Sequence, residues 1–389
     1  MHRPRKSRGD SLPHCSHLTI GPHWEEFMAR RLRALFATVF TACLVGPVSA
    51  QPAPATFEAV LEAAKKENGL VVRLSSPGRP QAIAALTEAF NKRFGLSVKP
   101  DWAPANAPVT NTRVITEAGS GRGSIDIIGL GSAEDVSSMV SRNLVIAYPW
   151  AEVFGKQLPA IQRAADAVLP ELRGQALPVL DAVYGLAWNP ALIDEASLPK
   201  TTADLVDPKW QGKMAINSAF LNPLPSMAYV IGPQAMQDYA SKLLRNKPVL
   251  EQGTPAVSRA ISVGQVPFGV TTYHAAQRTM QNGEPQKFRL LDDYVFVFEG
   301  YAYVPENAPN KNTARLFLAW LTTEGIAVAN QHEALPLISN PESDIAKLIA
   351  AHVARTQAKM ATPTSLEQIK STEVLRQTIS KMISGQIAN

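Results

Sequence analysis

Cysteine is nearly absent from this sequence of 389 residues, which contains only Cys15 and Cys43. Both precede Gln51, where we expect the exported chain to begin, and four of the seven histidines precede it as well. The exported chain therefore has no thiol nucleophile, disulfide or cysteine-based zinc site. It keeps three histidines, which lie in unrelated sequence contexts: His274, His332 and His352.

Net charge is also nearly absent once the first 50 residues are set aside. The whole chain carries a formal charge of +5, but the part from Gln51 has 31 Lys and Arg against 30 Asp and Glu. We therefore expect no nucleic-acid partner. The H-E-x-x-H, G-x-S-x-G, P-loop and G-x-G-x-x-G motifs are missing too, so we expect neither an enzyme nor a bound cofactor.

No apolar stretch reaches the about 20 residues that a membrane-spanning helix needs, but a shorter one lies near the N-terminus. From Met28, three arginines precede the apolar run Ala34–Val45, and a small-x-small cleavage site ends at Ala50. This layout predicts that residues 28–50 are a signal peptide cleaved near Ala50 and that the protein reaches the periplasm. Lipid attachment at Cys43 is the alternative, but the leucine wanted three residues before it is missing.

Strand-like and helix-like segments alternate in the rest of the chain. Apolar residues at helical spacing predict helices that begin near Phe57 and Ile83 and end at Gly69 and Gly95. The last 50 residues also read as helices. This alternation predicts an α/β protein with a mostly parallel sheet. Short apolar runs predict the strands: 70–74, 96–102, 124–130, 184–188, 213–217, 266–271 and 295–304.

Three longer segments carry a family resemblance. They are "DLVDPKWQGKMAIN" (Asp204–Asn217), "NKPVLEQGTPAVSRAISVGQVPFGV" (Asn246–Val270) and "APNKNTARLFLAWLTTEGIAVANQHEALP" (Ala308–Pro336). In this order they resemble the extracellular solute-binding proteins (family 1-like) of bacterial ABC importers, in the branch of the ferric-ion-binding proteins. The resemblance implies a type II periplasmic-binding fold, in which two α/β lobes close on a ligand in the cleft between them.

The resemblance also implies how the chain divides between the lobes. We expect residues 1–27 to be a non-native extension ahead of the signal peptide, because Met28 already begins a complete leader. The exported part is then divided as follows: lobe one in 51–180, lobe two in 181–295, a return to lobe one in 296–332, and C-terminal helices packing mainly on lobe two in 333–389.

Polar residues that follow the strands of lobe one are candidate ligand contacts. Ser75 and Ser76 stand in a strand-to-helix loop, where hydroxyls and free N–H groups hold anions in α/β proteins. Arg79 can bind a carboxylate or a phosphate, or can be an ordinary surface arginine. Ser132 follows a strand and can touch ligand or cap the next helix, and Ser76 has the same capping alternative.

Lobe two supplies a second set of candidates. Ser218 follows a predicted strand and Thr254 opens a predicted helix, and the resemblance implies anion contacts at both. Tyr184 can stack on or hydrogen-bond a ligand, or can belong to the core. Thr272 precedes Tyr273 in the loop "VTTYHAAQR" and joins the ligand-binding candidates.

That loop, Val270–Arg278, helps to distinguish ferric ion from other possible ligands. Ferric-binding relatives carry two consecutive tyrosines where this chain has Tyr273 and His274, and His274 can equally be a packed histidine. Because one phenolate is too few for a hard trivalent ion, we expect Fe³⁺, if it is the cargo, to need Tyr273 as metal ligand together with an exogenous anion. A phosphonate, another oxyanion and a small organic ion are the alternatives.

The sequence thus predicts the periplasmic substrate-binding component of an ABC transporter. It would capture a small solute by lobe closure and deliver it, as a monomer, to a permease in the inner membrane. A ligand-sensing periplasmic module for a membrane receptor is the alternative, because the same closed form can be presented to either partner.

Overall fold

The computed structural model describes residues 56–67 and 69–387, all within one compact unit, Pro54–Asn389. The predicted extension 1–27, the signal peptide and its cleavage near Ala50 lie outside the described residues. In the part that is described, every helix is too short or too polar to cross a membrane.

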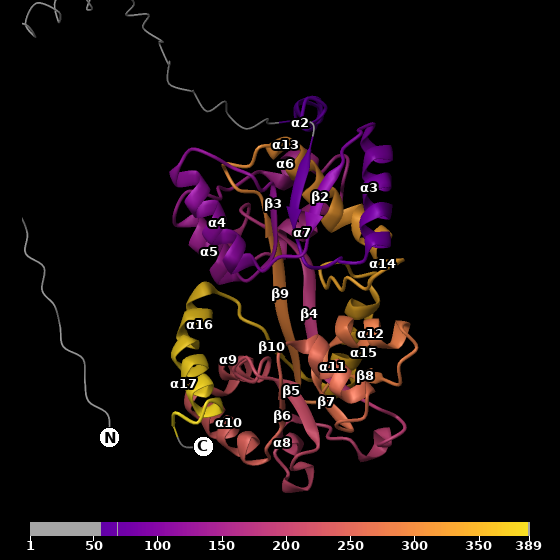
Figure 1. The fold of residues 1–389 in the computed structure, drawn as a ribbon, viewed down its shortest axis with the longest axis vertical. Coiled ribbons are helices and arrows are strands. Elements are labelled where there is room, and N and C mark those ends of the chain that lie inside the picture. The colour runs from indigo at the N-terminus through magenta and orange to yellow at the C-terminus, as the bar shows by residue number, and fades with distance from the viewer. Residues whose placement is uncertain (1–55, 68, 388–389) are drawn as a thin grey trace, which may run out of the picture. The chain divides into compact units, whose positions relative to one another are not determined.

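The described strands form one mixed sheet in the order β2-β1-β3-β9-β4-β7-β5-β6, with β10 beside β9 and β8 beside β4 (Figure 1). Seven of them were predicted from the apolar runs, although β4 begins seven residues before the predicted start at residue 184. The strands are β1 Leu70–Arg73, β2 Pro100–Ala103, β3 Ile127–Gly131, β4 Leu177–Trp188, β5 Met214–Asn217, β6 Val249–Glu251, β7 Phe268–Thr272, β8 Lys287–Arg289, β9 Tyr294–Tyr303 and β10 Lys359–Ala361.

The prediction of a mostly parallel sheet holds at the two ends of the sheet and fails at its centre. At one end β1 pairs in parallel with β2 and β3, and at the other β5 pairs in parallel with β6 and β7. Between them β9 is antiparallel to β3 and β4, and β4 is antiparallel to β7. The long strands β4 and β9 therefore connect two parallel groups (Figure 1).

Helices cover both parallel groups, and the two predicted from the first apolar stripes are present. The second of these, α3, ends where predicted because Gly95 adopts the left-handed conformation, with φ of 65°. The α-helices are α2 Phe57–Ala64, α3 Pro80–Phe94, α4 Ala107–Gly119, α5 Ala133–Val140, α6 Trp150–Phe154, α7 Ile161–Asp166, α8 Thr202–Leu205, α9 Ala228–Ile231, α10 Pro233–Arg245, α11 Thr254–Ser262, α12 Tyr273–Gln281, α13 Lys311–Trp320, α14 Ile326–Asn330, α15 Asp344–Thr356, α16 Leu366–Ser371 and α17 Glu373–Ile383.

The C-terminal segment contacts both parallel groups. The helices α15, α16 and α17 were predicted, but the strand β10 between α15 and α16 was not, and it pairs with β9. Helix α17 packs against α10, whereas α16 contacts α5. The proposed lobe boundaries stay a prediction.

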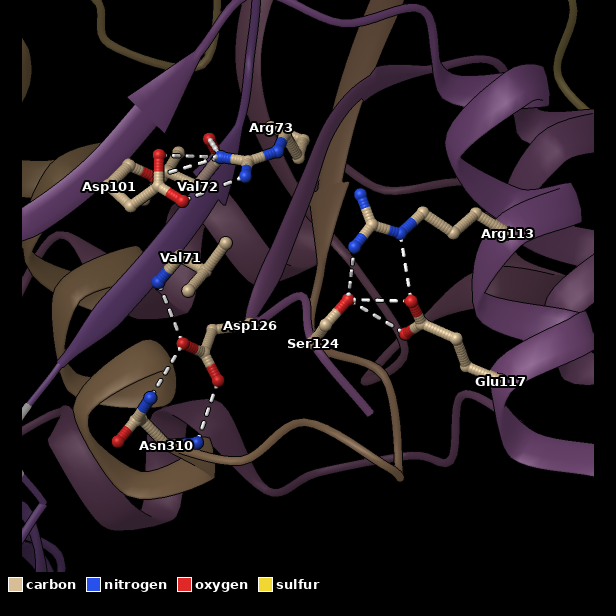
Figure 2. A network of polar contacts seen from close by, with 9 residues as sticks. All are labelled: Val71, Val72, Arg73, Asp101, Arg113, Glu117, Ser124, Asp126 and Asn310. Atoms are coloured by element: carbon tan, nitrogen blue, oxygen red, sulfur yellow. Dashed lines mark hydrogen bonds and ion pairs between the residues drawn. The ribbon is translucent and has the colours of Figure 1, made fainter. Parts of the chain in front are cut away.

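A buried carboxylate fixes the first strand relative to its neighbours. Asp126, which is 0% exposed, accepts hydrogen bonds from the backbone N–H of Val71 at 2.7 Å and from Asn310 at 2.7 and 2.9 Å. Figure 2 shows this carboxylate between β1 and the segment that leads into α13. An unpaired buried carboxylate would be costly, so these bonds hold the start of β3, β1 and the beginning of α13 in one arrangement.

Candidate ligand-binding site

The carboxyl ends of the two parallel groups of strands point toward each other. Strand β3 pairs with the C-terminal part of β9, and β7 pairs with the C-terminal part of β4. Because β4 and β9 are antiparallel, β3 runs from its own group toward the other, and β7 runs in the opposite direction. Loops that follow strands converge at such carboxyl ends, where ligands bind in α/β proteins.

The loop after β1 binds a carboxylate of the chain itself, that of Glu333. The Ser76 hydroxyl donates to Glu333 Oε1 at 3.1 Å, and the backbone N–H groups of Gly78 and Arg79 donate to Glu333 Oε2 at 2.8 and 2.9 Å. The guanidinium of Arg278 pairs with the same carboxylate. Ser76 therefore does not cap α3, since Arg79 is the N-cap residue.

Ser75 and Arg79 differ in their surroundings. Ser75 is exposed and lines a shallow hollow beyond the carboxyl ends of β1, β2 and β3, together with residues 104–108 and Leu130. The guanidinium of Arg79 donates to the side-chain oxygen of Asn282 at 3.1 Å, so it bridges the loop after β1 to the end of α12.

Ser132 has the structural role that the sequence left open. Its hydroxyl accepts from the Asp135 N–H at 3.2 Å and donates to Asp135 Oδ2 at 2.9 Å, while its own N–H donates to that oxygen at 2.8 Å. These contacts form a capping box that begins α5.

Replacing Ser132 with alanine should lower the free energy of unfolding by about 1 kcal/mol, which is the usual value of an N-cap hydroxyl. Ligand affinity should stay unchanged because the hydroxyl is committed to the cap. Urea unfolding and a ligand titration of Ser132→Ala check the two statements separately. Unchanged stability together with weakened binding would assign the hydroxyl to the ligand instead.

Ser218, Thr254 and Thr272 come together at the carboxyl ends of β5 and β7. The Ser218 N–H donates to the carbonyl of Glu251 at 2.8 Å. The Thr272 hydroxyl donates to the Thr254 hydroxyl at 3.3 Å and caps α12 by accepting from the Ala275 N–H. The two threonine hydroxyls thus hold the start of α11 beside the start of α12, and both side chains are buried.

Tyr273 directly follows Thr272 and is the first residue of α12. Its ring meets Phe288 edge-on at 5.6 Å, and it lines hollows with Gln277 and Asp344 that include neither Ser75 nor the residues after β5. Burial and the charge of Asp344 raise the pKa of its phenol. Within the described ranges, no cluster of three or more His, Cys, Asp and Glu side chains suits a metal ion.

His274 is packed rather than exposed to solvent. Its Nε2 lies 3.4 Å from the Thr272 hydroxyl, and its Nδ1 is buried without a hydrogen-bond partner in the part of the chain that is described. Burial, with the positive charge of Arg278 nearby, lowers the pKa of the imidazole to about 4. The ring is therefore neutral at physiological pH.

An enclosed pocket that the sequence did not predict lies at the carboxyl ends of β3 and β5. Its volume is about 110 Å³, and its walls come from the start of α5, residues 220–229, β9, and the helices α16 and α17. Asn222 lines it and donates to the Tyr184 hydroxyl at 2.8 Å, so Tyr184 supports the pocket from the buried strand β4. Four aromatic side chains form part of the lining: Phe220, Tyr229, Phe298 and Tyr301.

Charged groups also line this pocket. Glu134 at the start of α5 pairs with Arg376 of α17 at 2.8 Å, and the Arg376 guanidinium lies 5.9 Å from the ring centre of Phe220. Glu299 of β9 accepts a hydrogen bond from the Tyr301 hydroxyl. Two carboxylates and one guanidinium thus line the pocket, and because Arg376 pairs with Glu134, Glu299 has no basic counterpart in the lining.

Glu299, which is half-buried, lies opposite the buried carboxyl group of Asp181. The two residues are directly opposite each other in the antiparallel β4–β9 pair, and both line a second hollow next to the enclosed pocket. Burial raises the pKa of Asp181 to about 7, despite a hydrogen bond from the Ile338 N–H at 2.6 Å, and the charge of Glu299 adds to the effect. Burial also raises the pKa of Glu299.

The fold agrees with the comparisons. A family model for bacterial extracellular solute-binding proteins matches residues 75–328. The chain belongs to this family. A curated relative, the Fe(3+)-binding periplasmic protein of Serratia marcescens, is 24% identical over 189 residues, which cover 41% of this chain. The matched part spans 56% of the length of that relative.

Solved structures of solute-binding proteins share the fold along most of the chain. Iron-bound HitA from Pseudomonas aeruginosa aligns with a TM-score of 0.62 at 17% identity, covering 80% of this chain and 99% of HitA. The substrate-binding protein of an ABC transporter from Agrobacterium tumefaciens aligns with a TM-score of 0.64 at 17% identity, covering 82% and 96%. The predicted type II periplasmic-binding fold of this family is confirmed.

Proposed function

We propose that this protein is the periplasmic substrate-binding component of an ABC importer and that its cargo is a small organic molecule with a cationic group. The cargo would bind in the enclosed pocket between the start of α5, β9 and α17. The observation that carries the proposal is Glu299, a half-buried carboxylate in an aromatic-lined pocket whose one arginine, Arg376, already pairs with Glu134.

The chemistry of the lining favours an ammonium group over an anion. Aromatic rings attract cations, and Tyr229 and Tyr301 line the same space as Glu299. A buried charge is costly unless it is paired, so a ligand cation would relieve the cost that raises the pKa of Glu299. The pair of Glu134 and Arg376 can remain intact beside it.

Ferric ion is the precedent among relatives, but the predicted arrangement of ligands for it is not supported. The single phenolate of Tyr273 packs on Phe288, in hollows separate from Ser75, Ser218 and Thr254. A bridging anion held by those hydroxyls would therefore lie away from the phenolate. A trivalent ion needs several oxygen donors at one point, so the organic ligand is favoured.

Capture would use the connection between the two parallel groups of strands. The pocket receives walls from the ends of both groups, and β4 and β9 connect them. A ligand that touches both walls stabilises the closed form by its differential affinity for that form. The permease would recognise the closed form, and one copy of the chain contains the whole pocket, so a monomer suffices.

Native mass spectrometry of protein purified from its own periplasm tests the proposal. We expect a small organic amine in the retained complex, and isothermal titration with small amines and their neutral isosteres should show binding of the amines alone. Ferric ion added with citrate or phosphate should give no tyrosinate colour. Retained iron with that colour, or binding of the neutral isosteres alone, would contradict the proposal.

A further inference from the structure

The loop between β1 and α3 already contains an anion. Four donors meet on the carboxylate of Glu333: the Ser76 hydroxyl, the N–H groups of Gly78 and Arg79, and the guanidinium of Arg278. The Glu333 side chain is only 3% exposed. Free N–H groups at the beginning of a helix and a nearby arginine are the groups that bind phosphate or carboxylate ligands in other proteins.

The charges around Glu333 show that it is held as an anion. Burial alone would raise its pKa, but the hydrogen bonds from Arg79 and Gly78 and the charge of Arg278 bring the pKa below its ordinary value. The Arg79 guanidinium donates to Asn282 at 3.1 Å and to the carbonyl of His332 at 3.5 Å, so it is held toward α12. The Ser76 hydroxyl and the N–H groups of Gly78 and Arg79 are thus engaged with Glu333.

We propose that Glu333 is a specificity-determining residue that occupies the oxyanion position of the loop after β1 and excludes free phosphate-like ligands from it. This proposal deepens the proposed function and rests on it in one respect, which is that the cargo binds in the pocket lined by Glu299 and not at this loop. An anionic ligand would have to displace a carboxylate that makes charge-assisted bonds with four groups, and two anions cannot share the position. The loop thus contributes rigidity to the site rather than affinity for anions.

Glu67 offers a matched control. Its carboxylate accepts from the N–H groups of Asn312 and Thr313 at 3.2 and 2.7 Å, so it also occupies the beginning of a helix, α13, from a distant part of the chain. None of the ion pairs in the described part of the chain joins Glu67 to an arginine, whereas Arg278 pairs with Glu333. If freeing any helix N-terminus raises phosphate affinity, Glu333→Ala and Glu67→Ala should both show the gain. If the loop after β1 is a specific oxyanion position, only Glu333→Ala should show it.

Isothermal titration with inorganic phosphate tests the proposal. Glu333→Ala should bind phosphate about tenfold or more tightly than the unmodified protein, because the Arg278 guanidinium loses its ion pair and can bind the ligand. Glu67→Ala should show no gain, and adding Arg278→Ala to Glu333→Ala should remove about tenfold of the affinity. Circular dichroism confirms that each variant is folded. A folded Glu333→Ala variant with no gain, or an equal gain in Glu67→Ala, overturns the proposal.

The unmodified protein provides a test that does not depend on a variant folding. Crystals soaked in phosphate should retain the Glu333 carboxylate on the loop, whereas a phosphate ion in its place would overturn the proposal. Binding of amines in the enclosed pocket is measured separately and uses none of these residues. Failure of the amine ligand and failure of the Glu333 assignment are therefore distinguishable.

Discussion

Glu299→Gln is expected to weaken binding of the amine cargo by about ten- to a hundredfold, because a hydrogen bond to a charged group contributes about 1.5–3 kcal/mol. The glutamine keeps the size of the side chain and removes its charge. The change therefore tests the charge of Glu299 with little disturbance of β9. Isothermal titration with the amine found in the periplasmic complex measures the effect.

Two matched changes separate charge recognition from general damage. Glu324→Gln makes the same chemical change in a carboxylate that pairs with Arg93 away from the pocket, and it should leave affinity unchanged. Glu134→Gln removes a pocket carboxylate that already pairs with Arg376, so its effect should be smaller than that of Glu299→Gln. If all three changes weaken binding equally, Glu299 is not the cation-binding group.

The local sequence predicted most of the strands. The antiparallel pairing at the centre of the sheet could not be predicted, because it joins segments that are far apart in the sequence. Apolar runs predicted β1 and β9 because burial on both faces of a strand leaves a continuous apolar segment. Nothing in either run states that β9 pairs with β3 in the opposite direction. The short strand β10 was missed for the same reason, since only its pairing with β9 makes it a strand.

The candidate site was predictable only in part. The resemblance located the carboxyl ends of strands: Ser76 lies in the loop after β1, Thr272 is the last residue of β7, and Thr254 is the first residue of α11. The partner of Ser76 was missed because Glu333 is 257 residues away in the sequence. Glu299 was missed because it lies in a run that was read as an apolar strand. Its position opposite Asp181 depends on the pairing of β4 with β9, which the local sequence does not contain.

The orientation of the Tyr273 ring could not be predicted from the loop sequence. The sequence placed it in a ligand loop because relatives have phenols there. In the structure Tyr273 is the first residue of α12, and its ring packs on Phe288. The direction of a side chain in the first turn of a helix depends on what the helix packs against, which the loop sequence does not contain.

Stability should depend on pH through two buried groups that act in opposite directions. The pKa of His274 is lowered to about 4 in the folded protein, so the unfolded chain binds the proton first as the pH falls. Its contribution is fully present above the ordinary value of 6.5 and is lost as the pH falls toward 4. The pKa of Asp181 is raised to about 7, so its contribution is fully present below 3.8 and is lost as the pH rises toward 7.

The two contributions should therefore oppose each other between about pH 4 and pH 7, and the pKa shifts limit them to about 3 kcal/mol for His274 and about 4 kcal/mol for Asp181. His274→Gln removes the first contribution, so relative to the unmodified protein its free energy of unfolding should fall as the pH rises. Asp181→Asn removes the second and should show a relative rise over the same range. Urea unfolding at a series of pH values measures both, and subtracting the unmodified profile removes the common contribution of surface carboxylates.

The groups that face each site do not change these signs. Burial and the charge of Arg278 both disfavour protonation of His274, and together they outweigh the charge of Glu333, which favours it. Glu299 lies opposite Asp181, so the two carboxyl groups titrate as a coupled pair. Asp181→Asn should therefore also lower the pKa of Glu299. Difference profiles of the same sign for the two variants would contradict the assignment, because a buried imidazole and a buried carboxyl respond to burial in opposite directions.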